Sequence, residues 1–95
     1  MKAIIVPGAE WGTGDRTYHL ITEDGEMLAS HVCSSPAYAP ADLYEQRPER
    51  QAMFNEKGIT EFCWLADSGI AEEELRRRNG EWAAATVPPR EEKTQ

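Results

Sequence analysis

The chain has 95 residues, enough for one folded domain but not for two separate hydrophobic cores. Apolar residues make up 40% of it and charged residues 28%, a composition typical of globular rather than disordered proteins. The formal charge is −7, with 10 basic against 17 acidic residues, which opposes binding to nucleic-acid phosphates. No apolar run approaches the ~20 residues of a membrane helix. We therefore expect neither nucleic acid nor a membrane among its partners.

The sequence predicts a single α+β domain over residues 1–87. Residues 88–95 begin with two prolines and are otherwise polar, so we expect a flexible C-terminal tail there. No charged and then apolar leader precedes the first apolar run, which favours a cytoplasmic protein. In that compartment thiols stay reduced, so Cys33 and Cys63 are expected to be buried thiols rather than a disulfide.

The first third of the chain predicts three strands. The apolar run 3–6 has strand length and is followed by Pro7-Gly8 and a glycine-rich loop. Residues 17–22 carry β-branched and aromatic side chains, and Asp24-Gly25 after them favours a type I′ hairpin turn. A two-residue turn of this type predicts three facing pairs: Ile21 and Leu28, Leu20 and Ala29, and Tyr18 and His31.

The rest of the chain predicts short helices around one more strand. Prolines suited to a first helical position open helical segments over 40–45 and 48–57. A strand is expected over 59–65, and the polar stretch 67–69 supplies caps for a last helix. One face of that helix carries Ala71, Leu75, Asn79 and Trp82. The expected order is β-β-β-α-β-α, a small, mostly antiparallel sheet with its helices packed on one face.

Most of the side chains able to bind a ligand lie between residues 31 and 50. Two serines stand where a strand passes into a helical segment, whose backbone amides favour an anion. Two arginines offer the paired donors that carboxylates and phosphates fit, and aromatic rings can stack on a planar ligand. The candidate ligand-binding residues are Trp11, Tyr18, His31, Ser34, Ser35, Tyr38, Arg47 and Arg50. In the alternative interpretation the serines cap helices, the arginines pair with Glu45 and Glu49, and the aromatic rings pack.

The histidines, cysteines and serines also offer candidates for a metal site and a catalytic site. His31 and Cys33 lie two apart on one strand face, but the same register sends His19 to the other face, and no Cys-x-x-Cys spacing occurs. Strand neighbours two apart lie ~7 Å from each other, too far for His31 to activate a Cys33 or Ser34 nucleophile. The sequence also places no carboxylate to orient a histidine. We therefore expect no metal, no cofactor and no enzyme, in preference to a small hydrolase or a zinc protein.

Several segments together resemble small uncharacterised accessory proteins of bacteriophages. The segments that carry the resemblance are Leu20–Glu26, Ser30–Ser35, Asp42-Leu43, Arg47–Arg50 and Glu72–Trp82. The resemblance implies a protein that acts by binding, either sequestering a host nucleotide signal or blocking a host protein. It brings no catalytic residues.

The expected function is therefore that of a non-enzymatic, phage-type accessory protein that binds a small anionic, nucleotide-like ligand, such as a host-defence signal. The alternative is an inhibitor of a host protein that acts through an acidic surface and the aromatic rings of Trp11 and Tyr38. A homodimer is also expected, because eight aromatic residues are many for so small a core and a four-stranded sheet leaves two edges to cover. The ligand site is then expected at or near the dimer interface.

Overall fold

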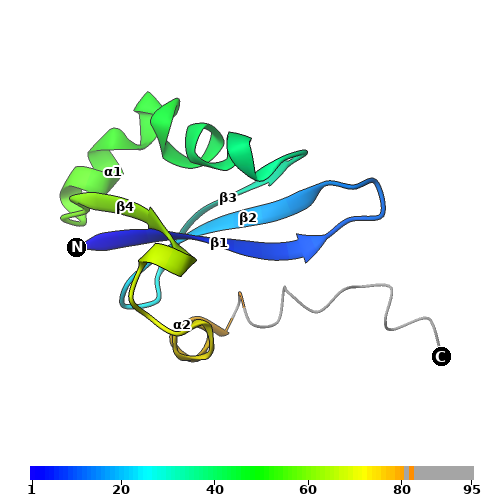
Figure 1. Ribbon diagram of the computed structural model, residues 1–95. Helices are drawn as coiled ribbons and strands as arrows, with labels where there is room; N and C mark the ends of the chain where they lie inside the picture. Colours follow the sequence, from blue (N-terminus) through cyan, green and yellow to red (C-terminus); the bar gives the residue numbers. More distant parts are fainter. Residues whose placement is uncertain (81, 83–95) are drawn as a thin grey trace.

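A computed structural model describes residues 1–80 and 82 and confirms the predicted α+β class and element order (Figure 1). The tail predicted for residues 88–95 lies outside the described residues. Four strands form one sheet in the order β3-β2-β1-β4, with β1 antiparallel to β2 and parallel to β4. The strands are β1 (Lys2–Glu10), β2 (Arg16–Thr22), β3 (Met27–Cys33) and β4 (Glu61–Trp64).

The central strand β1 is longer than its apolar run predicts. It continues through Pro7 and Gly8 to Glu10, with a bulge after Pro7. Proline is tolerated there because the pairing with β4 ends at Ile5, so no partner strand needs the missing N–H. A side chain at Gly8 would collide with the imidazole of His19 on β2. Gly8 thus serves a close strand contact rather than the loop that the sequence predicted.

The β2–β3 hairpin has the predicted register over most of its length but a different turn. Tyr18 lies opposite His31, and Leu20 opposite Ala29, as predicted. Asp24 does not have the positive φ that a type I′ turn needs; only Gly25 does, at 100°. The Gly25 N–H donates to Thr22 O, so the hairpin uses a three-residue loop that ends in a glycine bulge. The extra residue moves Met27, rather than the predicted Leu28, opposite Ile21.

A run of short helices covers one face of the sheet. Its elements are η1 (Pro36–Tyr38), η2 (Ala41–Glu45), η3 (Pro48–Arg50) and α1 (Gln51–Glu56). Gly58 ends the run at φ 71°, as predicted. Leu43 and Phe54 from these helices pack with Ala3, Ile5 and Leu20 of the sheet in the larger hydrophobic core. None of the helices in the described part of the chain is long and apolar enough to cross a membrane.

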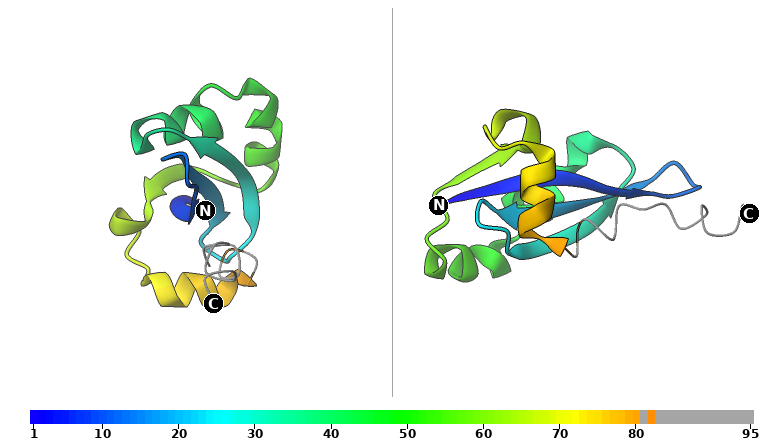
Figure 2. Two further views of the ribbon diagram at one scale, coloured as in Figure 1. Left: turned by 90° about the vertical axis from the view of Figure 1, so that its right-hand side faces the viewer. Right: turned by 90° about the horizontal axis from the view of Figure 1, so that it is seen from below.

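The opposite face of the sheet is also covered by a helix, which corrects the prediction of helices on one face. After β4 the chain forms η4 (Leu65–Asp67) and then α2 (Glu72–Arg78), which crosses below the sheet (Figures 1 and 2). Leu75 and Trp82 pack there against alternate residues of β1 and one residue of β2 in a second core. Its fully buried sheet residues are Ile4, Val6 and Ile21.

Buried hydrogen bonds hold the end of α2 against the sheet. The side chain of Asn79 donates to Gly25 O at 2.8 Å and accepts from the Trp82 N–H at 2.7 Å. The indole N–H of Trp82 donates to Pro7 O at 2.9 Å. These polar groups are satisfied inside the core, so the docking of α2 is specified by geometry as well as by apolar contact. Arg76 stacks on the outer side of the Trp82 ring at 4.2 Å.

Candidate functional site

The two arginines of the predicted anion site converge, but on the chain itself. Arg47 Nε donates to Asp42 O at 2.9 Å, and Arg50 Nη1 donates to the same oxygen at 3.3 Å and to Leu43 O at 2.7 Å. Arg47 also lies 3.8 Å from the Glu49 carboxylate. Both guanidinium groups therefore stabilise carbonyl groups of η2, which have no intrahelical partner so close to its end. The guanidinium N–H groups of Arg47 and Arg50 are therefore already used within the chain, and a ligand would have to displace the Asp42 and Leu43 carbonyls to bind them.

The predicted serines and Tyr38 lie where β3 passes into η1. Ser35 is the N-cap of η1, and its hydroxyl accepts from the Ala37 N–H at 3.3 Å. Ser34 is exposed, and Tyr38 is 57% exposed on the helix that follows. Of these three side chains, Ser35 has the capping role of the alternative interpretation, whereas Tyr38 is available to a partner.

The other two predicted aromatic residues have different environments. Tyr18 is 6% exposed and packs edge-to-face on Trp64, with ring centroids 6.0 Å apart. It belongs to the larger core and cannot stack on a ligand, which corrects that prediction. Trp11 lies in the β1–β2 loop, is 46% exposed, and donates its indole N–H to Thr17 Oγ1 at 2.8 Å. Trp11 is therefore an ordered surface ring that can contact a partner.

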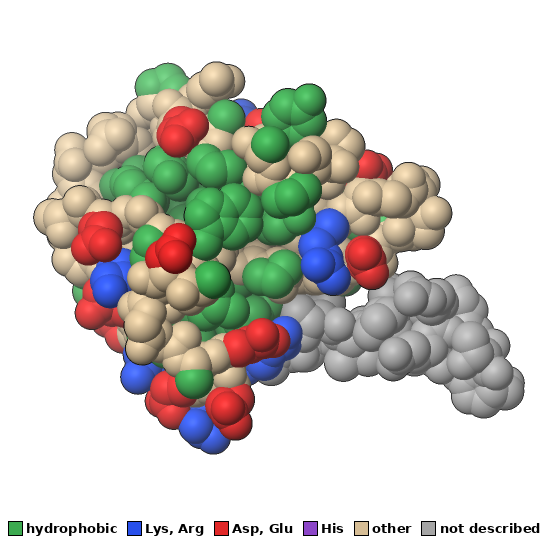
Figure 3. All heavy atoms as spheres, viewed as in Figure 1, with side chains coloured by type: hydrophobic (Ala, Val, Ile, Leu, Met, Phe, Trp, Pro, Cys, Tyr) green, Lys and Arg blue, Asp and Glu red, His purple; other side chains and the backbone are tan. Residues whose placement is uncertain are grey.

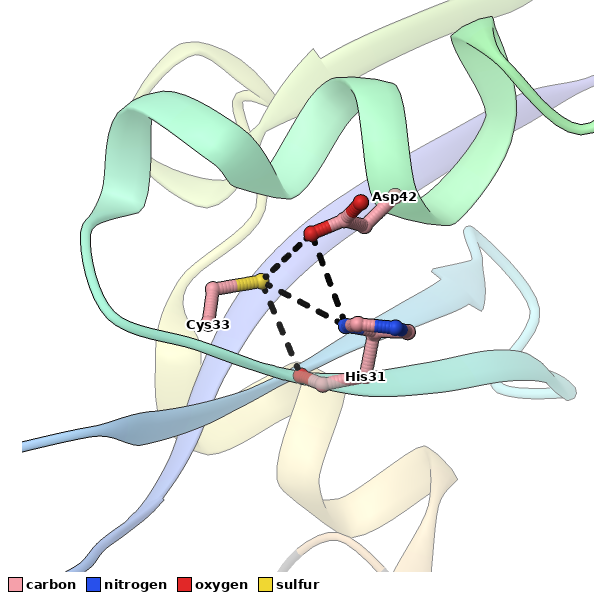
Figure 4. A group of neighbouring side chains, drawn as sticks. All are labelled: His31, Cys33 and Asp42. Atoms are coloured by element: carbon pink, nitrogen blue, oxygen red, sulfur yellow. Dashed lines mark hydrogen bonds and ion pairs between the residues drawn. The ribbon is translucent and has the colours of Figure 1, made fainter.

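A compact cluster of three metal-ligating side chains lies at the end of β3 (Figure 4). Asp42 Oδ2 lies 3.5 Å from His31 Nδ1 and 3.4 Å from Cys33 Sγ, and Cys33 Sγ lies 3.9 Å from His31 Nδ1. Two expectations are thereby corrected. The imidazole and the thiol lie closer together than the ~7 Å expected for strand neighbours two apart. A carboxylate, that of Asp42, also faces the histidine.

Asp42 is the member of this cluster that the sequence analysis did not predict. Its position beside His31 and Cys33 depends on tertiary structure. The turn capped by Ser35 reverses the chain after β3, so that η2 carries Asp42 back over the strand end. No periodicity links residue 42 to residues 31 and 33. The only local signal was an acidic residue in the first turn of a helix that follows the strand closely.

Burial and Asp42 both affect the chemistry of Cys33. Desolvation, followed by the hydrogen bond and the negative charge of Asp42, raises the pKa of the Cys33 thiol to about 11. The thiol is therefore protonated at neutral pH and donates to the carboxylate. Because the thiolate is the nucleophilic form, this environment does not favour covalent catalysis by Cys33.

The remaining candidate metal ligands do not join the cluster. Cys63 is a half-buried free thiol packed against the second core, whereas Cys33 is a buried free thiol in the first core, on the other face of the sheet. His19 contacts Ser30 Oγ through Nδ1 at 2.6 Å. The prediction of two free thiols is confirmed, although Cys63 is less buried than expected.

The sheet edge formed by β4 carries a half-exposed apolar surface (Figure 3). Within the described residues β4 pairs with β1 alone, so its outer side has no strand partner. Phe62 stacks on Tyr44 from η2, with ring centroids 3.9 Å apart, and its ring also meets Phe54 edge-to-face. We call the following half-buried residues the β4 surface: Tyr44, Phe62, Cys63, Trp64 and Leu65.

The fold and these sites define a small α+β protein with a four-stranded mixed sheet, helices on both faces, a polar cluster at the end of β3 and an apolar surface at the β4 edge. Comparisons with known protein families, curated proteins and solved structures found no match to the chain. The resemblance to phage accessory proteins therefore stays a prediction.

Proposed function

We propose that the protein is a non-enzymatic interaction protein that binds an extended segment of a partner protein along β4. The observation that carries the proposal is a strand edge that pairs with no other strand of residues 1–80 and is flanked by half-exposed aromatic rings. Lys2 O accepts from the Glu23 N–H next to β2, so the backbone groups of Ala3 and Ile5 point toward β4. Ala3 pairs with Phe62 and Ile5 with Trp64, and in a parallel pair the backbone groups of both residues point the same way. The backbone groups of Phe62 and Trp64 therefore point outward, where a partner strand can pair with them.

The surroundings of β4 favour a particular partner chemistry. An added strand gains affinity from main-chain hydrogen bonds and specificity from alternate side chains. Here the β4 surface fits apolar side chains, while the exposed carboxylates Glu61 and Asp67 and the net charge of −7 favour basic flanking residues. The resemblance to phage accessory proteins makes a host protein in the bacterial cytoplasm the expected source of such a segment.

A matched pair of substitutions at Trp64 tests this mode of binding. Trp64→Pro removes one outward N–H without removing a hydrogen bond to β1, and the φ of −81° at this position suits proline. Trp64→Ala removes the same ring and keeps the N–H. The immobilised chain is used to capture proteins from a bacterial lysate. A partner retained by wild type and Trp64→Ala but lost with Trp64→Pro supports strand addition. Equal retention by both variants, or no retained protein, argues against it.

The binding of a small anionic, nucleotide-like ligand is a second candidate function. The specific observation in its favour is that Arg47 and Arg50 bring two guanidinium groups to one carbonyl oxygen beside the end of β3. Against it, those donors already serve Asp42 and Leu43 within the chain. A ligand that binds the folded state raises the melting temperature. We therefore test mono-, di- and cyclic nucleotides for a thermal shift that Arg47→Gln removes; no shift at millimolar ligand excludes this function.

A further inference from the structure

Three different kinds of ligand atom meet at the end of β3, at the opposite edge of the sheet from the β4 surface. They are the Nδ1 of His31, the Sγ of Cys33 and a carboxylate oxygen of Asp42, and all lie within 4.8 Å of one another. Nitrogen, thiolate sulfur and carboxylate oxygen are the ligand types that zinc binds in proteins. We infer that His31, Cys33 and Asp42 form a zinc site in which the chain supplies three ligands.

The spacing of the three atoms agrees with tetrahedral zinc. Zinc bonds of ~2.0–2.3 Å set two ligands of a tetrahedron roughly 3.3–3.6 Å apart. The separations here are 3.4 Å from Sγ to Oδ2, 3.5 Å from Nδ1 to Oδ2 and 3.9 Å from Sγ to Nδ1. Only the last exceeds the expected range. Side-chain rotations that bring Sγ and Nδ1 closer by a few tenths of an ångström therefore suffice to close the site around an ion.

Two arginines also fix the backbone of Asp42. Arg47 and Arg50 both donate to the backbone carbonyl of Asp42, the residue whose side chain faces the site. Groups that orient a ligand in this way contribute to metal affinity without touching the metal. This arrangement assigns the convergent arginines a role as positioning residues, and it does not depend on the anionic ligand considered above.

Binding has a defined proton balance. Without metal, the thiol donates to Asp42, and His31 Nδ1 lies 3.0 Å from Val32 O, where it donates as the Nδ1–H tautomer. Zinc requires a thiolate and an unprotonated Nδ1. The Cys33 proton therefore leaves to solvent, and the imidazole proton moves to Nε2. The soft sulfur ligand selects zinc over Mg²⁺ or Ca²⁺, which prefer oxygen ligands, and three protein ligands leave a fourth position open.

The test uses the full chain, stripped of metal with a chelator and then titrated with Zn²⁺ alone in a calorimeter. We expect one ion per chain. Cys33→Ser and Asp42→Asn preserve side-chain size, and each should weaken binding by more than about 100-fold, beyond the usual cost of losing an orienting group. The matched control is Cys63→Ser, which removes the other free thiol and should leave the affinity unchanged. Mg²⁺ titrated in the same way should give no comparable binding.

Co²⁺ provides a second measurement that does not depend on any variant folding. In the wild-type chain it should produce a thiolate-to-cobalt charge-transfer absorption, which persists in Cys63→Ser. Arg47→Gln should weaken Zn²⁺ binding by about 10–100-fold, as expected for a positioning residue. The proposal is overturned if wild type binds Zn²⁺ no more tightly than Cys33→Ser, if the Co²⁺ band is absent, or if the band is lost with Cys63→Ser instead.

Discussion

Two glycines with positive φ offer a direct test of how α2 is held against the sheet. Gly25 in the β2–β3 turn has φ 100°, and Gly58 after α1 has φ 71°. A Cβ on Gly58 would meet nothing within 4 Å. A Cβ on Gly25 would collide with the carbonyl oxygen of Arg78 and lie 2.7 Å from the Arg78 Cβ. Gly58→Ala therefore tests backbone strain alone. Gly25→Ala tests the same strain together with the docking of α2.

The expected magnitudes differ clearly. Gly58→Ala should cost about 1–2 kcal/mol of unfolding free energy, the strain of a left-handed alanine. Gly25→Ala adds about 1–3 kcal/mol for the collision. It also puts at risk the hydrogen bonds from Asn79 to Gly25 O and from Arg78 to Glu23 O, each worth about 1 kcal/mol. We expect a total of about 3–5 kcal/mol.

Urea unfolding followed by far-ultraviolet circular dichroism measures the loss of unfolding free energy in both variants. Thermal unfolding measures the matching fall in Tm. At about 4–8 °C per kcal/mol for a domain of this size, Gly58→Ala should lower Tm by roughly 5–15 °C and Gly25→Ala by about three times as much. The fluorescence of the buried Trp82 should also change in folded Gly25→Ala but not in folded Gly58→Ala. Equal losses of stability in the two variants would refute the inference that the turn and α2 pack so closely.

Three further predictions concern the end of α2, the acid stability of the chain and its oligomeric state. Asn79→Ala leaves Gly25 O without its buried donor, and it should cost about 2–3 kcal/mol in urea unfolding. Hydrogen bonds from Arg77 and Arg78 lower the pKa of Glu74 from its usual value of 4.5. The ionised carboxylate therefore stabilises the fold above pH 4.5, and this stabilisation is lost as the pH falls through the lowered pKa. Glu74→Gln should accordingly flatten the fall of Tm with acid. Light scattering tests the expected homodimer: twice 10.7 kDa for wild type but 10.7 kDa for Trp64→Pro would show that β4 pairs with a second copy, whereas 10.7 kDa for both contradicts a dimer.

Local signals predicted the strands and much of the register. The Asp24-Gly25 turn lies between two strand-like runs. The facing pairs farther from it match the prediction because an irregularity between Leu20 and Ile21 cancels the shift that the third loop residue introduces. The error at Ile21 has a local cause as well. Only Gly25 adopts a positive φ, so the loop takes a third residue and the pairing next to it shifts by one.

The location of the helices on both faces of the sheet is also indicated by the sequence. The run from Ala3 to Val6 is apolar at every position rather than at alternate ones, which indicates a strand buried on both faces. A strand of this kind needs a cover on each side. The apolar stripe of the last helix, by contrast, indicates that one helical face is buried but not which face of the sheet receives it.

The candidate sites were less predictable because they depend on contacts between distant residues. Asp42 meets His31 and Cys33 only after η2 folds back over β3. The arginines appeared available for an anion because no pattern shows that a side chain will cap a nearby helix end. Tyr18 appeared to be a possible stacking ring, and its burial depends on Trp64 of β4, far along the chain.

The parallel pairing of β1 with β4 has a consequence for the order in which the chain folds. The pairs β1–β2 and β2–β3 join neighbours in sequence, whereas Lys2 pairs with Glu61, 59 residues further along the chain. Closing so long a loop costs entropy before its contacts form, so we expect β4 to join the sheet after the three-stranded meander. The amide proton of Cys63, which faces β1, should then exchange with solvent sooner than those between β1 and β2. The strand proposed to receive a partner is thus also the strand that opens most readily, and a bound segment would protect its amides from exchange.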